Sequence, residues 1–169
     1  MSAPTDEQDA ALEHDGYIPL DGDENVTRLR QHQAFLVGLG IPSEVASTLD
    51  HIGVQAATTP AFEQIMAKYK ENARGTEVVD RGDRRIAMID RGDGLYRVEL
   101  FEPRAGQPAP RPGFVHYAFI WPGWKPREGE LRDMVELTRT ANLNGNWLAF
   151  LATPDGYEVE IVSEPVAFT

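Results

Sequence analysis

The chain contains no cysteine, which excludes disulfide bonds, thiolate metal ligands and cysteine nucleophiles. It also has no apolar run near the roughly 18 residues that a membrane-spanning helix needs. Basic residues are scarce, because 16 lysines and arginines stand against 27 aspartates and glutamates, for a formal net charge of −11. Such a chain would repel a nucleic-acid backbone and an anionic membrane surface. There is no basic segment followed by an apolar run at the N-terminus, so we expect no signal peptide and a cytoplasmic protein.

The first 48 residues differ in composition from the rest. Residues 1–24 are acidic and polar with scattered apolar positions, a composition that predicts a disordered tail. Residues 25–48 show a loose helical spacing of apolar residues and contain glycines and a proline that end helices, so they predict a helical extension. His14 and His32 lie in these segments, and we expect both to be exposed to solvent.

The rest of the chain repeats one order of predicted elements. Residues 49–103 predict a strand, a helix and three short strands, and the proline-rich residues 104–112 predict a linker. Residues 113–165 predict the same order again, with a helix expected over 126–143. The sequence therefore predicts an α+β fold with a domain at 49–165, in which two βαβββ modules form a curved mixed sheet, or cup.

Each predicted module opens with a strand that carries a histidine and closes with a strand that carries a glutamate. His51 and Glu99 are 48 residues apart (99 − 51), and His116 and Glu160 are 44 apart (160 − 116). The four residues thus occupy equivalent places in the two modules. Alternation along each strand puts aliphatic and aromatic residues on one face and the histidine or glutamate on the other. If the second faces curve inward, the four side chains converge.

Two imidazoles and two carboxylates suit a divalent ion such as Zn, Ni, Co, Mn or Fe. The two carboxylates balance the charge of the ion, which a buried site requires. A strand histidine or glutamate taken singly is more often an ordinary core or surface residue, so the prediction depends on all four coinciding. Arg97 shares the face of Glu99, and Gln55 shares the face of His51. We interpret these two as candidate substrate contacts, while an ion pair of Arg97 with Glu158 or another acid is an equally good interpretation.

Four segments carry a resemblance to a known family: LDHIGV at 49–54, VELFEP at 98–103, GFVHYAF at 113–119 and PDGYEVEIV at 154–162. Together they resemble the glyoxalase / vicinal-oxygen-chelate (VOC) superfamily over about residues 49–165. The resemblance implies paired βαβββ modules around a metal site. It also implies a ligand set like that of glyoxalase I, made of His51, Glu99, His116 and Glu160. The N-terminal extension has no counterpart in that family.

The resemblance implies three alternative functions. The first is a metal-dependent lyase or isomerase that moves a proton next to a carbonyl of a small oxygen-chelating substrate, with Glu160 or Glu99 as the carboxylate and the metal stabilising an enediolate or enolate. The second is an Fe(II)-dependent dioxygenase of the extradiol type with His51, His116 and Glu160 as ligands. The third is a metal-free protein that binds or sequesters a small molecule. Related folds pair through edge strands, so a homodimer is also an expectation.

Overall fold

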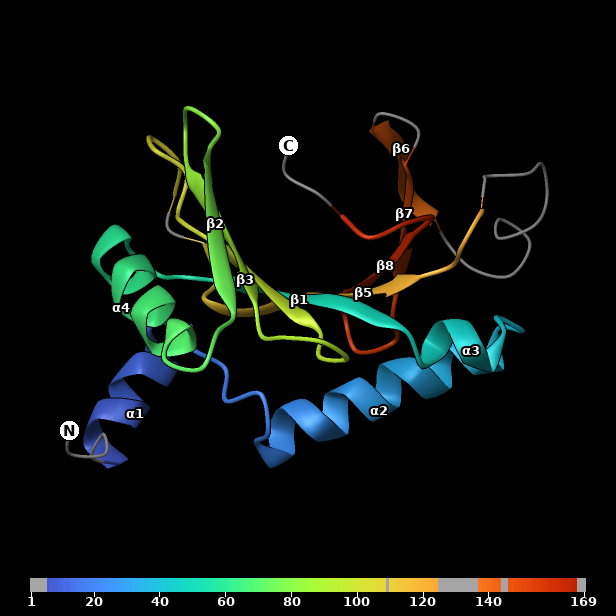
Figure 1. The fold of residues 1–169 in the computed structure, drawn as a ribbon, viewed down its shortest axis with the longest axis horizontal. Helices are drawn as coiled ribbons and strands as arrows, with labels where there is room; N and C mark the ends of the chain where they lie inside the picture. The colour runs from blue at the N-terminus through green and yellow to red at the C-terminus, as the bar shows by residue number, and fades with distance from the viewer. Residues whose placement is uncertain (1–5, 109, 125–136, 144–145, 167–169) are drawn as a thin grey trace. The chain divides into compact units, whose positions relative to one another are not determined.

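A computed structural model describes residues 6–108, 110–124, 137–143 and 146–166, with the side chains of Asp6 and of 137–143 left undescribed (Figure 1). The chain divides into two compact units, each made of two segments. Unit 1 comprises Met1–Gly22 and Ile52–Val115, and unit 2 comprises Asp23–His51 and His116–Thr169. None of the helices in the described ranges has the length and apolar character needed to cross a membrane.

Unit 1 contains the first predicted module from Ile52 onward. Its elements are the second half of β1 (Leu49–Gln55), α4 (Thr59–Lys70), β2 (Gly75–Asp80), β3 (Arg85–Asp90) and β4 (Arg97–Phe101). The strand–helix–three-strand order predicted from the sequence is confirmed. β3 pairs antiparallel with both β2 and β4. At the start of α4, the Thr58 side chain accepts a hydrogen bond from the Ala61 backbone N–H, which satisfies a free donor of the first turn.

One face of the β3–β4 pair packs on α4. Val98 and Leu100 of β4, Ile89 of β3 and Phe62 of α4 are all completely buried, and α4 contacts both strands. Because side chains alternate along a strand, Glu99 lies on the opposite face of β4. The strand parity expected from the sequence is therefore present in β4.

The acidic N-terminal segment is not a disordered tail over its described part. Residues Asp6–His14 form helix α1, and the chain after it contacts α4. The Tyr69 hydroxyl of α4 donates a hydrogen bond to the Ile18 carbonyl oxygen at 2.7 Å, and the Ala57 N–H donates to the Asp15 carbonyl oxygen at 2.9 Å. These contacts order a polar segment because they give its backbone carbonyl groups hydrogen-bond partners from elsewhere in the unit.

Unit 2 contains the strands of the second predicted module and the helical extension. Its elements are α2 (Asp23–Gly38), α3 (Ser43–Ala46), the first part of β1, most of β5 (Gly113–Ile120), β6 (Leu137–Leu143), β7 (Asn146–Ala152) and β8 (Glu158–Val162). β5 pairs parallel with β8, β8 antiparallel with β7, and β7 antiparallel with β6. The predicted α+β class with mixed strand pairing is thus confirmed.

The helix expected over residues 126–143 is wrong for its last part. Residues 137–143 form β6, which pairs with β7 through contacts such as Thr140 opposite Ala149. Pairing with β7 stabilises a strand here, although the spacing of apolar residues suggested a helix. The segment also contains β-branched threonines, which favour strands. The remainder of the expected helix, up to residue 136, lies outside the described residues.

Helix α2 covers the apolar face of the unit 2 sheet (Figure 1). The Tyr117 hydroxyl of β5 donates to the Asn25 carbonyl oxygen of α2 at 3.0 Å, and the rings of His32 and Tyr117 meet edge to face with centroids 5.4 Å apart. His32 is only 2% exposed, so the expectation that it is solvated is wrong. Its Nε2 lies 2.9 Å from Oδ2 of Asp155, and this partner explains how a polar ring is buried there.

Candidate metal centre

Three of the four predicted ligands meet in unit 2. Nε2 of His116 lies 3.0 Å from Oε2 of Glu160, and Nε2 of His51 lies 3.4 Å from the same oxygen. The two histidine Nε2 atoms are 3.2 Å apart. We name His51, His116 and Glu160 the triad. All three are buried, with exposures of 1%, 7% and 5%.

The sheet register explains why the triad meets. In the parallel β5–β8 pair, Ala118 lies opposite Glu160, and Glu160 lies opposite Phe150 on β7. Opposite residues in a ladder share a face, and alternation puts His116 on the face of Ala118. His116 and Glu160 therefore project to the same side of the sheet. The other face of these strands, with Tyr117 and Ile161, is completely buried.

Asp50 is a site residue that sequence reasoning missed. Its Oδ2 lies 2.7 Å from Nδ1 of His51, and Asp50 is itself 6% exposed. Since a carboxylate accepts the Nδ1 hydrogen, Nε2 of His51 is left with a lone pair directed at the other members of the triad. The same carboxylate oxygen accepts the Val166 backbone N–H at 3.4 Å. The available signal was the Asp-His pair in LDHIGV, but alternation places neighbouring side chains on opposite faces of a strand.

The histidines hold Glu160 in its charged form. Burial alone would raise the pKa of Glu160, but its contacts with His116 and His51 outweigh burial and hold the pKa well below its usual value. Glu160 is therefore a carboxylate at neutral pH.

The spacing of the triad fits a divalent ion. Two ligand atoms about 2.1 Å from one ion, at angles between 90° and 109°, are about 3.0 to 3.4 Å apart. The three distances within the triad span that interval, from 3.0 Å to 3.4 Å. Two imidazole nitrogens and one carboxylate oxygen are also ligands that Zn, Ni, Co, Mn and Fe accept. The residues present in unit 2 thus fit a metal ion of this class.

The triad adjoins an apolar cluster. The Phe150 ring meets the His116 ring edge to face, with centroids 6.0 Å apart. Phe150 belongs to a buried cluster with Leu148 and Val162, against which Ile120 and Val166 pack. An apolar surround lowers the local dielectric and strengthens the electrostatic interactions of a bound ion.

The remaining predicted residues lie in unit 1. Glu99 and Arg97 belong to β4, and the role of Glu99 as a fourth ligand stays a prediction. The Gln55 amide nitrogen donates to the backbone carbonyl oxygens of Ala56 and Phe101 at 3.0 and 3.2 Å. Those bonds fix the Gln55 side chain against the end of β4, and its contact with a substrate also stays a prediction.

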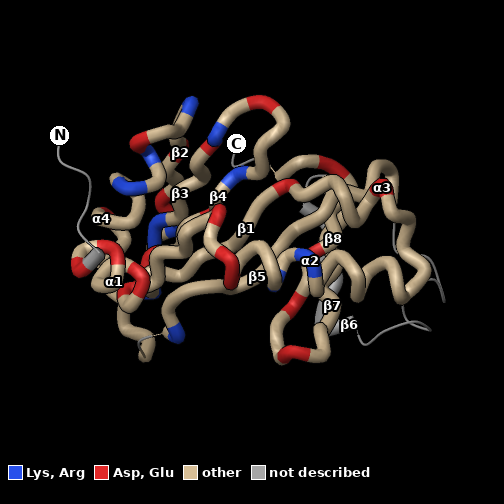
Figure 2. The backbone as a smooth tube through the Cα atoms, turned by 90° about the horizontal axis from the view of Figure 1, so that it is seen from below, with Lys and Arg blue, Asp and Glu red and all other residues tan. Residues whose placement is uncertain are grey.

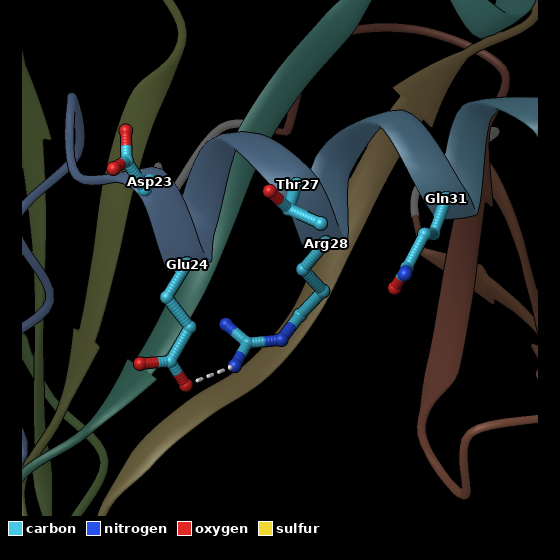
Figure 3. A pocket seen from close by; sticks show the side chains of 5 residues that line it. All are labelled: Asp23, Glu24, Thr27, Arg28 and Gln31. Atoms are coloured by element: carbon cyan, nitrogen blue, oxygen red, sulfur yellow. Dashed lines mark hydrogen bonds and ion pairs between the residues drawn. The ribbon is translucent and has the colours of Figure 1, made fainter.

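A shallow surface pocket of about 380 Å³ lies along α2 (Figure 3). Its lining residues are Asp23, Glu24, Thr27, Arg28 and Gln31. Glu24 and Arg28 form an ion pair at 3.0 Å on one side of the helix. The predicted site residues are not part of this lining, so the pocket is not the candidate metal centre.

Comparison with known proteins gives a likeness of fold. No protein-family model matches the chain, and no curated protein matches it in sequence. A hypothetical protein from Bacillus halodurans C-125 matches with a TM-score of 0.52 and 20% identity, over 72% of this chain and 97% of its own. This likeness shows the fold alone.

Other solved structures match with a TM-score of 0.47. One is a variant of Streptomyces coelicolor methylmalonyl-CoA epimerase in complex with 2-nitronate-propionyl-CoA, at 25% identity over 68% of this chain and 92% of its own. Another is a Mn(II)-bound glyoxalase from Novosphingobium aromaticivorans, at 17% identity over 75% of this chain and 40% of its own.

Proposed function

We propose that this chain is a metal-dependent enzyme of the VOC type, a lyase or isomerase that moves a proton next to a carbonyl of a small oxygen-chelating substrate. The observation that carries the proposal is the convergence of His51, His116 and Glu160 at a buried point of unit 2. Burying charged groups costs free energy of folding. A cluster of them in one place is therefore typical of a functional site.

The residues of unit 2 have separate roles in this proposal. The Nε2 atoms of His51 and His116 and the Oε2 atom of Glu160 hold the ion. A bound divalent ion supplies Lewis-acid polarisation of a substrate carbonyl. Asp50 holds the His51 ring in the orientation and tautomer that present Nε2. Phe150 and its apolar neighbours limit the access of water.

The proton is moved by a carboxylate. Glu160 is charged at neutral pH for the reasons given above, and once it loosens from its ligand position its carboxylate would accept a proton from a carbon beside a carbonyl. Glu99, at the equivalent place in the first module, is our proposed fourth ligand and the alternative proton carrier. Arg97, on the face of Glu99, and Gln55 are our proposed substrate contacts.

The composition of the triad supports a second candidate. Two histidines and one carboxylate, without Glu99, are the ligand set of Fe(II) oxygenases, and unit 2 supplies all three. Under that alternative the protein is an extradiol-type dioxygenase. Activity that depends on Fe(II) and is lost in air would favour it, whereas activity with Zn or Ni would favour the lyase or isomerase.

Metal content tests the proposal against a metal-free binding protein. Protein purified without chelator is analysed by mass spectrometry for metals, as wild type, Glu160→Gln and Glu164→Gln. We expect close to one ion per chain in the wild type and in Glu164→Gln, which removes an exposed charge from the same unit. Glu160→Gln should lose most of its metal. Full occupancy and activity in Glu160→Gln, or no metal in the wild type, contradicts the proposal.

Two further expectations from the sequence stay predictions, the homodimer and the cytoplasmic location. Light scattering on the purified chain measures the first, and fractionation of the source cells measures the second.

A further inference from the structure

Two neighbouring arginines of unit 1 have opposite surroundings. Nη2 of Arg85 lies 2.7 Å from a carboxylate oxygen of Glu63 and 2.7 Å from one of Glu102. Its guanidinium carbon is 4.9 Å from the centroid of the Phe62 ring. Arg84 also lies on an aromatic ring, with its guanidinium carbon 4.5 Å from the centroid of Phe101. Within the described ranges, however, no carboxylate forms an ion pair with Arg84.

The lack of a carboxylate partner for Arg84 is unexpected in this chain, where 27 acidic residues stand against 16 basic ones. The Nε atom of Arg84 is enclosed and has no hydrogen-bond partner among the described residues. Burial, followed by the positive charge of Arg104, lowers the pKa of Arg84. A partly desolvated guanidinium that keeps its charge attracts an anion more strongly than one fully in water.

The acidic residue nearest in sequence is already engaged. Oδ2 of Asp83 lies 2.6 Å from Nη1 of Arg104, and the Ala105 N–H donates to the Asp83 carbonyl oxygen at 2.8 Å. Asp83 thus holds the loop after β4 against the β2–β3 turn and keeps Arg104 close enough for its charge to act on Arg84. Figure 2 shows basic and acidic residues interspersed in this part of unit 1.

The face on which Arg84 lies is that of the predicted ligand Glu99. Arg84 contacts the Phe101 ring, and Phe101 and Glu99 are two residues apart on β4, so they share a face. The charge of Glu99 acts on Arg84 as well. A group bound by Arg84 would therefore lie on the side of β4 that carries Glu99, and α4 covers the other side.

We propose that Arg84, with Arg104 beside it, binds an anionic group, a carboxylate or a phosphate, on the substrate of this protein. The planar guanidinium presents paired N–H donors that match two oxygens of such a group. The assignment of the anion to a substrate rests on the proposed function, but the anion site itself does not.

The test is titration of the metal-free full-length chain with inorganic phosphate and, separately, with malonate, followed by calorimetry or by backbone amide NMR. We expect the wild type to bind at least one anion and Arg84→Gln to bind it at least about tenfold more weakly. Arg85→Gln is the matched control. Arg85 is also stacked on a phenylalanine, but two carboxylates already neutralise its charge. This variant should keep the anion affinity and lose stability instead.

Each outcome decides the proposal. No binding of either anion by the wild type overturns it, and so does equal affinity in Arg84→Gln. If Arg84→Gln fails to fold by circular dichroism, Arg84→Lys and Arg104→Gln take its place, and each must weaken binding severalfold. Whichever of phosphate and malonate binds more tightly shows whether the site prefers a phosphate or a carboxylate. Metal content is measured in parallel: a wild type that binds anions through Arg84 but holds no metal refutes the proposed function and leaves the anion site standing.

Discussion

Nδ1 of His51 lies 2.7 Å from Oδ2 of Asp50, although the two residues are neighbours on one strand. Both are almost completely buried. The carboxylate oxygen also receives the Val166 N–H, so the segment after β8 contributes to the position of Asp50. A histidine ligand that is held through its second nitrogen loses less freedom when it binds an ion. Asp50 is therefore a positioning residue for the triad.

Asp50→Asn should weaken metal binding by about 10- to 100-fold, because the neutral amide makes the His51 ring a poorer ligand. The measurement is competition for the metal with a chromophoric chelator, with no activity assay required. Asp155→Asn is the control, since Asp155 makes the same kind of bond to His32, 2.9 Å from its Nε2, in the same unit. It should lower stability and leave metal affinity unchanged. Equal metal affinity in wild type and Asp50→Asn would show that the contact is only structural.

The Arg85–Glu102 pair predicts a pH dependence of stability in unit 1. Hydrogen bonds from Arg85 lower the pKa of the Glu102 carboxyl below its ordinary value of 4.5. A lowered pKa in the folded state stabilises the protein above the unfolded pKa, and this contribution is lost as the pH falls through the folded value. The side chain is 12% exposed, so solvent screens the pair only in part.

Glu102→Gln should accordingly lower the free energy of unfolding by about 1 to 2 kcal/mol at neutral pH. The difference from wild type should shrink below about pH 4.5. Urea unfolding at a series of pH values measures it. Glu63→Gln removes the half-exposed second partner of Arg85 and should have a smaller effect. A difference from wild type that stays constant down to pH 3 would contradict this account.

The Tyr117–Asn25 contact predicts how strongly α2 is held to the sheet of unit 2. The Tyr117 hydroxyl reaches the carbonyl oxygen and the side-chain oxygen of Asn25, at 3.0 and 2.5 Å, and both residues are buried. Tyr117→Phe leaves two buried acceptors without this donor, so it should cost about 1 to 3 kcal/mol of stability. Chemical unfolding measures the cost. A loss below about 0.5 kcal/mol would mean that the Tyr117–Asn25 contact does not hold α2 to the sheet.

The triad was predictable because its signals are local and repeated. Alternation in GFVHYAFI and EVEIV places His116 and Glu160 each on the face of its strand opposite the apolar face. The duplicated order of elements predicts that these two faces lie on the same side of the sheet. Asp50 was not predictable by that reasoning, since strict alternation directs it away from His51. The bond between the two depends on side-chain geometry at the first residues of β1, which a pattern of residue types does not encode.

The expectations of a disordered tail over residues 1–24 and of an exposed His32 are wrong for a physical reason. The composition of the first segment favours disorder when considered alone, yet Tyr69 bonds to Ile18, and Asp155 bonds to His32, from distant parts of the chain. A polar helix is stable when tertiary contacts provide partners for its polar groups, and the helix propensity of its residues does not report those contacts. Similarly, the ladder with β7 decides the conformation of residues 137–143.

Gly16 gives the sharpest test that this N-terminal segment is ordered. Its φ is +120°, and a Cβ on it would lie 2.2 Å from the Gln55 carbonyl oxygen of β1. Gly16→Ala must therefore displace the backbone, and we expect a loss of about 2 kcal/mol or more. Gly38→Ala is the control, because Gly38 ends helix α2 with no atom near its would-be Cβ. It should be neutral or stabilising by about 0.5 to 1 kcal/mol. Equal stability of the two variants would mean that residues 15–18 do not pack on β1 and α4 in solution.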